Sequence, residues 1–227
     1  MQYMGGKSRL AKDLARVIGG GGRLWEPFCG GGAMTAALAP QFDSVEASDT
    51  HEDLILMWQA LKAGWTPPSG VSEADYARLR SCPPSALRGF AGFAASWGGK
   101  WFGGYARSGA RSHAAESARS LARDVNKLSN VTFSQKSYTE ISPLPGDTIY
   151  ADPPYAGTTG YGKPFDSVSF WRTAESWAKA GALVFVSEYA APEDWPCVWD
   201  KAYARSMKAD LVTASRVTDK LFFKSVW

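Results

Sequence analysis

The stretch RLWEPFCGGGAMTAAL, residues 23–38, decides the fold that the sequence predicts. Its apolar beginning, residues 23–29, is typical of a short buried strand. Three glycines then form a turn, and the alanine-rich residues 33–38 predict a helix. A second strand is expected at residues 44–49, where it ends on Asp49. The order of strand, glycine turn, helix, strand and acid is the beginning of a doubly wound α/β sheet.

Periodic segments extend this pattern on both sides of one interruption. Helical periods predict helices at residues 7–18, 52–62 and 169–180, and apolar runs predict strands at residues 131–133, 148–151, 183–187 and 221–226. Between them lie double prolines, a cluster of glycines and aromatics, and one helix-like stretch at residues 114–128. We therefore expect an α/β domain of residues 1–62 and 130–227, interrupted by a mostly helical, loop-rich insert at residues 63–129.

The composition is that of an ordinary compact domain. The chain has 227 residues, of which 45% are hydrophobic and 21% charged. Its three cysteines, Cys29, Cys82 and Cys197, are widely spaced and form no CxxC pair, so we expect a reducing cytosol and no metal site. No apolar run is long enough for a membrane span, and the first residues lack the apolar stretch of a signal peptide. The expected location is the cytoplasm.

The insert carries most of the positive charge. Seven cations but only two anions lie between Arg88 and Lys127, so this segment carries +5, and the rest of the chain carries −2 of the net +3. Such asymmetry is typical of a surface that binds a polyanion. A solvated helical surface would show the same pattern, so the charge leaves both interpretations open.

A second motif, Asp152-Pro153-Pro154-Tyr155, directly follows a predicted strand. It therefore lies at the edge of the sheet where α/β proteins bind ligands. The two prolines fix the backbone and remove two N–H donors. They leave the Asp152 carboxylate, the Pro153 carbonyl and the Tyr155 ring to hold a planar heterocycle that bears an amine. The alternative is a simple turn in which Asp152 caps a helix.

The glycine turn at residues 30–32 lets a ligand approach the N-terminus of the following helix. Neither GxGxxG nor a phosphate-binding lysine motif fits this turn. Asp49, at the end of the next strand, is placed where an acid accepts hydrogen bonds from ribose hydroxyls. The glycines could also be only a tight turn, and Asp49 could cap the next helix.

Taken together, the motifs resemble the Dam-type family of DNA adenine methyltransferases. The matching elements are Tyr3-Met4-Gly5-Gly6-Lys7, then EPFCGGG at residues 26–32, Asp49, a long insert, and DPPY at residues 152–155. DPPY also occurs in other amino-group methyltransferases, but the lysine motif, EPFCGGG and the insert narrow the choice. The resemblance implies a Rossmann-like sheet that uses S-adenosylmethionine. The small size and the glycine-aromatic stretch at residues 96–109 suggest a phage or prophage version.

The resemblance also implies roles for individual residues. Residues expected at S-adenosylmethionine are Tyr3, Lys7, Glu26, Pro27, Phe28, Gly30, Gly31, Asp49, Ser137, Tyr138 and Asp152. Within that set, Lys7 would pair with the cofactor carboxylate. The target adenine would be held by Asp152, Pro153, Pro154 and Tyr155. The sequence departs from the family at Ser137, where an acid usually contacts the cofactor's adenine, and we expect Tyr138 to compensate by packing on that ring.

A paired adenine must leave the DNA stack before it can react. The insert offers cations for phosphates and aromatics that can wedge between bases, or that pack in the core. The residues expected at DNA are Lys100, Trp101, Tyr105, Arg107 and Arg111.

The predicted function is therefore a DNA adenine methyltransferase that acts on double-stranded DNA as a monomer or homodimer. A methyltransferase of RNA or of protein glutamine is one alternative, although it has no need of the basic insert. An inactive DNA-binding relative is the other, although it has no need of DPPY or Lys7.

Overall fold

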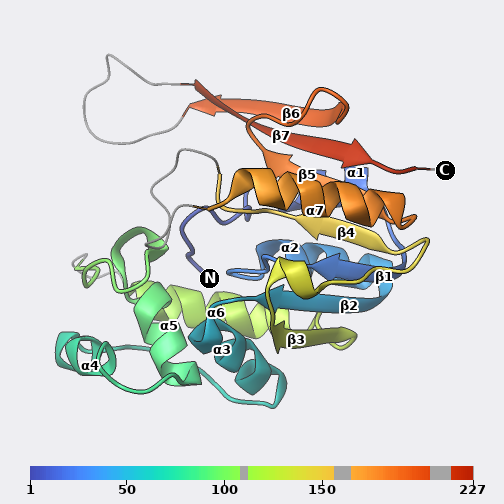
Figure 1. Ribbon diagram of the computed structural model, residues 1–227. Helices are drawn as coiled ribbons and strands as arrows, with labels where there is room; N and C mark the ends of the chain where they lie inside the picture. The colour runs from blue at the N-terminus through green and yellow to red at the C-terminus, as the bar shows by residue number, and fades with distance from the viewer. Residues whose placement is uncertain (108–111, 156–164, 205–215, 227) are drawn as a thin grey trace.

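The computed structural model describes residues 1–107, 112–155, 165–204 and 216–226, and within them a single seven-stranded sheet (Figure 1). The strand order is β3-β2-β1-β4-β5-β7-β6. The first five strands run parallel, whereas β7 pairs antiparallel with both β5 and β6. The strands are β1 Gly21–Glu26, β2 Phe42–Asp49, β3 Val131–Gln135, β4 Thr148–Ala151, β5 Leu183–Glu188, β6 Cys197–Ala204 and β7 Arg216–Lys224. The doubly wound α/β sheet predicted from the sequence is confirmed.

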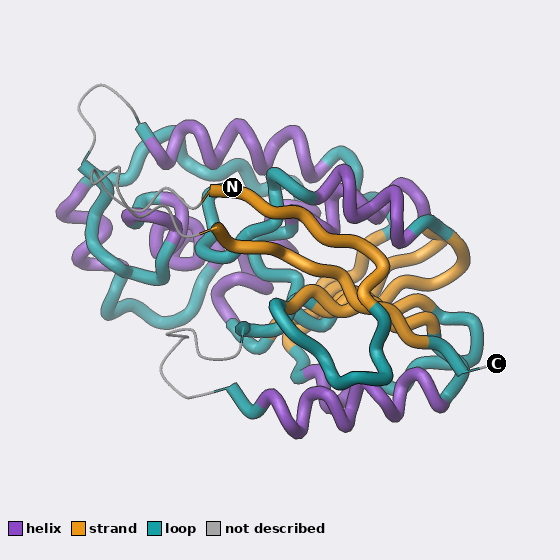
Figure 2. Tube along the Cα trace, turned by 90° about the horizontal axis from the view of Figure 1, so that it is seen from above, coloured by secondary structure: helices purple, strands orange, loops and turns teal. Residues whose placement is uncertain are grey.

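Helices cover both faces of this sheet. Helix α7 lies on one side of the strands and α1 on the other (Figures 1 and 2). The helices of the α/β part are α1 Ala11–Ile18, α2 Ala33–Leu38, α3 Glu52–Lys62 and α7 Ser167–Lys179. Those between β2 and β3 that follow α3 are α4 Glu73–Leu79, α5 Ala86–Ala94 and α6 His113–Val125. Short 3-10 turns occupy Ala39–Gln41, Trp97–Gly99 and Tyr138–Glu140.

Helix α1 and strand β6 differ from the sequence prediction, and β7 begins at Arg216 instead of residue 221. Helix α1 begins at Ala11 rather than at Lys7, because the Lys7 carbonyl accepts from the N–H groups of Leu10 and Ala11 in a turn, and no side chain caps the helix at Leu10. Strand β6 was not predicted. It pairs only with β7, and its residues 197, 198 and 200–202 are exposed, so it shows no buried apolar period.

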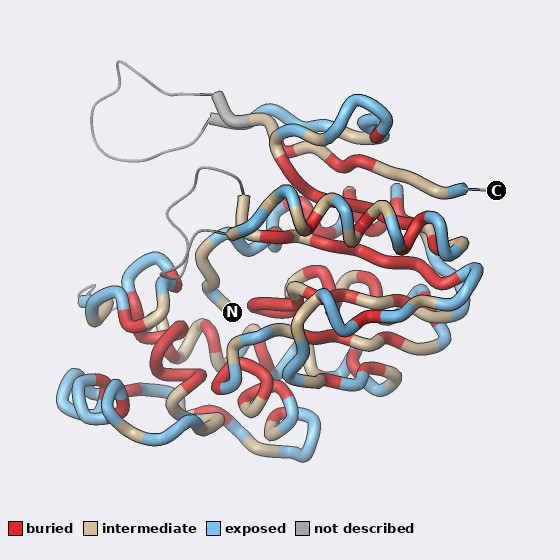
Figure 3. The backbone as a smooth tube through the Cα atoms, viewed as in Figure 1, coloured by how far each residue is buried: buried red, intermediate tan, exposed pale blue. Residues whose placement is uncertain are grey.

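The core lies on both faces of β4 and β5, whose residues are almost all buried (Figure 3). On one face, Ile149 and Ala151 of β4 pack with Phe170 and Trp177 of α7. On the other face, Tyr150 belongs to a larger apolar cluster. A strand buried on both faces needs apolar residues without alternation, which explains why Ile149, Tyr150 and Ala151 are consecutive hydrophobic residues.

Helix α5 of the insert packs directly on α3. Phe90 and Phe93 of α5 are fully buried in the same cluster as Leu54 and Trp58 of α3. Gly89 permits a close approach, because a Cβ atom there would lie 2.3 Å from the Asp53 carbonyl oxygen. The insert at residues 63–129 and the α/β domain thus share one core, and their division at these boundaries stays a prediction.

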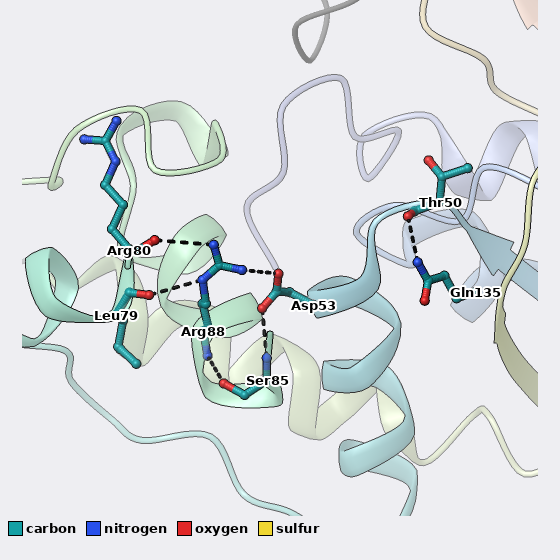
Figure 4. Close-up of polar contacts among 7 residues, drawn as sticks. All are labelled: Thr50, Asp53, Leu79, Arg80, Ser85, Arg88 and Gln135. Atoms are coloured by element: carbon teal, nitrogen blue, oxygen red, sulfur yellow. Dashed lines mark hydrogen bonds and ion pairs between the residues drawn. The ribbon is translucent and has the colours of Figure 1, made fainter. Parts of the chain in front are cut away.

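An ion pair between a half-buried arginine and a buried aspartate joins the same two helices (Figure 4). Arg88 of α5 donates to Asp53 of α3 at 2.6 Å, and also to the carbonyls of Leu79 and Arg80 at the end of α4. The other oxygen of Asp53 accepts from the Ser85 N–H at 2.9 Å. Arg88, counted from the sequence among the cations of a polyanion-binding surface, is therefore an internal anchor. None of the described helices is long and apolar enough to cross a membrane.

Candidate active site

The two sequence motifs meet where the sheet changes its winding direction. Strands β1 and β4 are neighbours and run parallel, and the chain continues from them to opposite sides of the sheet. Glu26 is the last residue of β1, and Asp152 directly follows β4. A crevice at the carboxyl ends of two such strands is the usual ligand site of an open α/β sheet.

The glycine turn after β1 is held by backbone contacts that only glycine permits. Gly30 and Gly32 adopt positive φ angles of 47° and 70°. A Cβ atom at Gly32 would lie 2.3 Å from the Trp58 ring, and the Trp58 indole donates to the Gly30 carbonyl at 3.1 Å. The turn therefore requires glycine for conformation and for close packing.

Asp49 holds this turn from the neighbouring strand. One of its carboxylate oxygens accepts from the Gly30 N–H at 3.1 Å, and the other accepts from the His51 N–H at 3.0 Å. His51 is the N-cap residue of α3, so Asp49 also orders the start of that helix. Burial raises the pKa of Asp49, and the two backbone donors oppose that shift.

Glu26 is a buried carboxylic group at the carboxyl end of β1. Its exposed fraction is 2%, and its Oε2 atom has no hydrogen-bond partner among the described residues. Burial raises the pKa of Glu26 to about 8, and the negative charges of Asp152 and Asp49 add to the effect. A positive group bound beside Glu26 would favour its ionised form.

Asp152 is paired with Lys7. The Lys7 Nζ atom lies 2.8 Å from Oδ1 of Asp152, and the exposed fractions of the two side chains are 8% and 18%. The same ammonium lies 4.6 Å from the centre of the Tyr155 ring. Burial raises the pKa of Asp152, and the charge of Lys7 opposes that shift. No local sequence pattern indicates this contact, because 145 positions separate the two residues.

Tyr155 is held by residues that sequence reasoning did not assign to the site. Its hydroxyl donates to Oδ1 of Asp219 at 3.2 Å. Its ring meets that of Tyr189 at 4.5 Å between centroids and nearly at a right angle (84°). Pro153 is buried and Pro154 is half-buried, so the segment after β4 is packed against the rest of the protein.

Tyr3 lies between the glycine turn and the insert. Its ring covers Gly30 and Gly31 so closely that a Cβ atom on either glycine would come within 3 Å of the ring or its Cβ. The other neighbour is Phe93 of α5, at 5.1 Å between ring centroids. The next residue, Met4, donates to the Gly99 carbonyl at 3.1 Å, which binds the N-terminal segment to the insert.

The predicted contacts to the cofactor's adenine lie together after β3. Tyr138 stacks on Phe28 with 5.5 Å between centroids, and it meets Phe170 edge-on. Ser137 caps the 3-10 turn that begins with Tyr138, because its hydroxyl accepts from the Thr139 N–H. The buried Pro27 precedes Phe28, so this aromatic cluster adjoins the glycine turn.

The predicted DNA-binding residues have different environments. Trp101 packs edge-on against His51 at 4.2 Å between centroids, and the Tyr105 hydroxyl donates to the Val71 carbonyl. Arg107 forms an exposed ion pair with Glu73, Lys100 is exposed, and Arg111 lies outside the described residues.

The exposed indole of the insert is Trp97, with an exposed fraction of 67%. The two glycines that follow Trp97 in the sequence indicate a turn at this position. Gly98 and Gly99 both adopt positive φ angles in the turn that exposes the indole.

Several solved structures are similar to the chain at low sequence identity. A precorrin 8W decarboxylase from Methanobacterium thermoautotrophicum is 14% identical, with 96% of this chain and 89% of that chain covered and a TM-score of 0.43. An rRNA methylase from Streptococcus thermophilus is 12% identical, with coverages of 96% and 95% and a TM-score of 0.40. The N-methyltransferase NodS from Bradyrhizobium japonicum is 9% identical, with coverages of 97% and 95% and a TM-score of 0.45. No curated protein sequence matches the chain.

A family model matches the part of the chain that carries the lysine motif, the glycine turn and Asp49. The model describes D12 class N6 adenine-specific DNA methyltransferases and covers residues 3–81. Over this segment the chain is therefore similar to D12 class N6 adenine-specific DNA methyltransferases, in agreement with the family resemblance and the class of enzyme predicted from the sequence.

Proposed function

We propose that this protein transfers a methyl group from S-adenosylmethionine to the exocyclic amine of an adenine that has been extruded from double-stranded DNA. The observation that supports this most is the position of Asp152. Its carboxylate stands on a proline-fixed segment beside the Tyr155 ring, at the same sheet edge as the buried carboxyl group of Glu26 and the half-buried one of Asp49. A hydrogen-bond acceptor, an aromatic ring and carboxylates that could bind a cation thus lie at the same edge of the sheet.

The carboxyl groups at this edge of the sheet suit the charge of the cofactor. S-adenosylmethionine carries a positive sulfonium and an ammonium group, and it supplies the methyl group when bound. The Oε2 atom of buried Glu26 has no hydrogen-bond partner among the described residues. The pKa values of Glu26, Asp49 and Asp152 are all raised, which indicates an excess of carboxyl groups at this edge of the sheet. A bound cation would relieve that excess, so the residues fit the cofactor.

Asp152 would accept a hydrogen bond from the adenine amine, and the Pro153 carbonyl would accept the second. The two acceptors favour an amine whose lone pair is free to attack. For this, the ion pair between Lys7 and Asp152 must first break. The Lys7 ammonium would then pair with the carboxylate of the cofactor. Positioning of the base on the Tyr155 ring supplies much of the remaining rate.

The turn of the insert at Trp97–Gly99 is the proposed DNA contact. Trp97 and Lys100 are both exposed, and the Met4–Gly99 hydrogen bond joins this turn to the segment that carries Tyr3 and Lys7. An exposed indole can stack on DNA bases, and an exposed ammonium can neutralise a phosphate. The proposed DNA contact and the proposed catalytic crevice are therefore neighbours.

Substitution of Asp152 tests the proposal. Asp152→Ala should reduce tritium transfer from labelled S-adenosylmethionine to duplex DNA at least ~100-fold, as loss of a transition-state contact does in other enzymes. Cofactor binding in calorimetry should survive, because the carboxylate faces the target amine. Asp43→Ala, which removes an exposed carboxylate, is the matched control. If Asp152→Ala retains more than about a tenth of the wild-type turnover, the role assigned to Asp152 is contradicted. If the wild-type protein labels RNA or protein and not DNA, the alternative acceptors are favoured.

A further inference from the structure

The strongest unassigned feature of the site is the carboxylate that holds Tyr155. Asp219 lies in β7, has an exposed fraction of 5%, and accepts from the Tyr155 hydroxyl at 3.2 Å. The two residues are 64 positions apart, and Asp219 lies far outside the segment that matches the family model. Its contact with the proposed adenine-stacking ring is the starting point of the inference.

The topology brings Asp219 to this edge of the sheet. Strands β4 and β5 end there, and β7 runs antiparallel to β5, so the first half of β7 lies where β5 ends. Lys220 is the partner of Glu188, the last residue of β5, and Asp219 is the next residue toward that edge. The antiparallel strand thus adds a buried carboxylate to a site formed otherwise by the ends of parallel strands.

The contacts of Tyr155 define the orientation of its ring. Asp219 holds the hydroxyl end, and Tyr189 meets the ring at 84°. Burial and the charges of Asp152 and Asp219 raise the pKa of Tyr155, so the hydroxyl stays protonated and remains a donor. A hydrogen bond to a carboxylate is roughly twice as strong as a neutral one, so this bond resists tilting of the ring.

We propose that Asp219 is a positioning residue for methyl transfer: its carboxylate holds the Tyr155 hydroxyl so that the ring presents a fixed face to the extruded adenine. Asp219 acts through Tyr155 and touches neither base nor cofactor. The inference rests on the proposed function and adds a residue to it. Its rival is a purely structural role, in which the buried carboxylate only stabilises the β6–β7 hairpin.

A double-mutant cycle separates these roles. Asp219→Ala should lower kcat on duplex DNA about tenfold, and Tyr155→Phe at least as much, because its hydroxyl also hydrogen-bonds Asp152. The double variant should lose little more than Tyr155→Phe alone, because Asp219 acts only through that hydroxyl. KM for DNA should change little, since phosphate contacts dominate duplex affinity. Asp219→Asn should recover most of the rate, because its amide oxygen still accepts from the hydroxyl. Losses that multiply to about a hundredfold would overturn the proposal.

Ser187→Ala is the matched control. It removes another buried bond of this region, between the hydroxyls of Ser187 and Tyr150 at 2.9 Å. We expect a lower Tm and an unchanged kcat, so an equal loss of kcat would indicate general loosening and would overturn the role of Asp219. A wild-type protein that methylates no DNA would contradict the proposed function itself, whereas an active wild type with multiplying losses contradicts only the inference about Asp219.

Discussion

At the scale of single residues, the candidate site concentrates carboxylates that are costly to bury. Glu26, Asp49 and Asp152 each have a raised pKa, and burial is the largest cause in every case. Among them, Asp152 has a cationic partner, Lys7, and Asp49 has two backbone donors. Clusters of carboxyl groups with raised pKa values are typical of functional sites, because ligand binding can recover the free energy that burial costs.

Glu26 should make the stability of the ligand-free protein depend on pH. Its pKa rises from 4.5 in the unfolded chain to about 8 in the folded protein, so the folded state binds the extra proton between these values. The free energy of unfolding should therefore fall as pH rises from 5 to 8, by on the order of a few kcal/mol. Glu26→Gln, which stays neutral, should lose this dependence.

Thermal unfolding between pH 5 and pH 9 measures this effect. The advantage in Tm of Glu26→Gln over the wild type should grow with pH, because only the wild type must ionise a buried group. Glu193→Gln, at an exposed position, is the control and should follow the wild-type curve. Parallel curves for the wild type and Glu26→Gln would show that Glu26 is already ionised at low pH.

At the scale of elements, the insert is held to the α/β sheet through α3 and α5. The two helices share apolar residues, approach closely at Gly89, and are joined by the ion pair of Asp53 and Arg88 (Figure 4). The Arg88 guanidinium also lies 5.2 Å from the Trp101 ring centre, in the loop after α5. One side chain thus connects α3, the end of α4 and the loop that precedes α6.

Replacement of Arg88 should lower the free energy of unfolding far more than replacement of an exposed arginine. Arg88→Ala leaves the Asp53 carboxylate buried without its charge partner, which typically costs about 3–5 kcal/mol. Arg107→Ala removes a pair with Glu73 whose side chains are 73% and 51% exposed, and such pairs contribute about 0–1 kcal/mol. Urea denaturation of both variants measures the difference, and equal losses would contradict the anchoring role of Arg88.

At the scale of the whole molecule, the positive charge of the insert remains the expected basis of DNA affinity, although Arg88 does not contribute to it. Simultaneous replacement of Lys100, Arg107 and Arg111 by alanine should reduce the slope of log K against log salt by up to about 3, since the slope scales with the phosphates neutralised. The Tm should hardly change, because exposed charges contribute little to folding.

Fluorescence anisotropy with a labelled duplex between 50 and 200 mM salt, about the range in which such slopes are clear, measures this effect. The matched control replaces three exposed cations outside the insert, Lys12, Arg16 and Lys179. A slope that changes in the control but not in the insert variant would place the DNA on another surface.

Local patterns in the sequence were enough to predict most of the sheet and both site motifs. The predicted helices at residues 33–38 and 52–62 have the observed bounds, and β1, β2, β4 and β5 lie within a few residues of prediction. Glycine turns, proline pairs and apolar periods act over a few neighbouring residues, so they are visible without a structure. Strand β6 was missed because an exposed edge strand has no apolar signal.

The sequence by itself determined that the glycine turn after Glu26 and the motif that begins at Asp152 each follow a strand of one α/β sheet. Only the tertiary structure decided which side chains these motifs meet: Lys7 pairs with Asp152, and Asp219 with Tyr155. It also decided that Trp101 is packed and Trp97 exposed. The physical reason is that strand order and helix packing join residues 64 and 145 positions apart, and no local period records such distances.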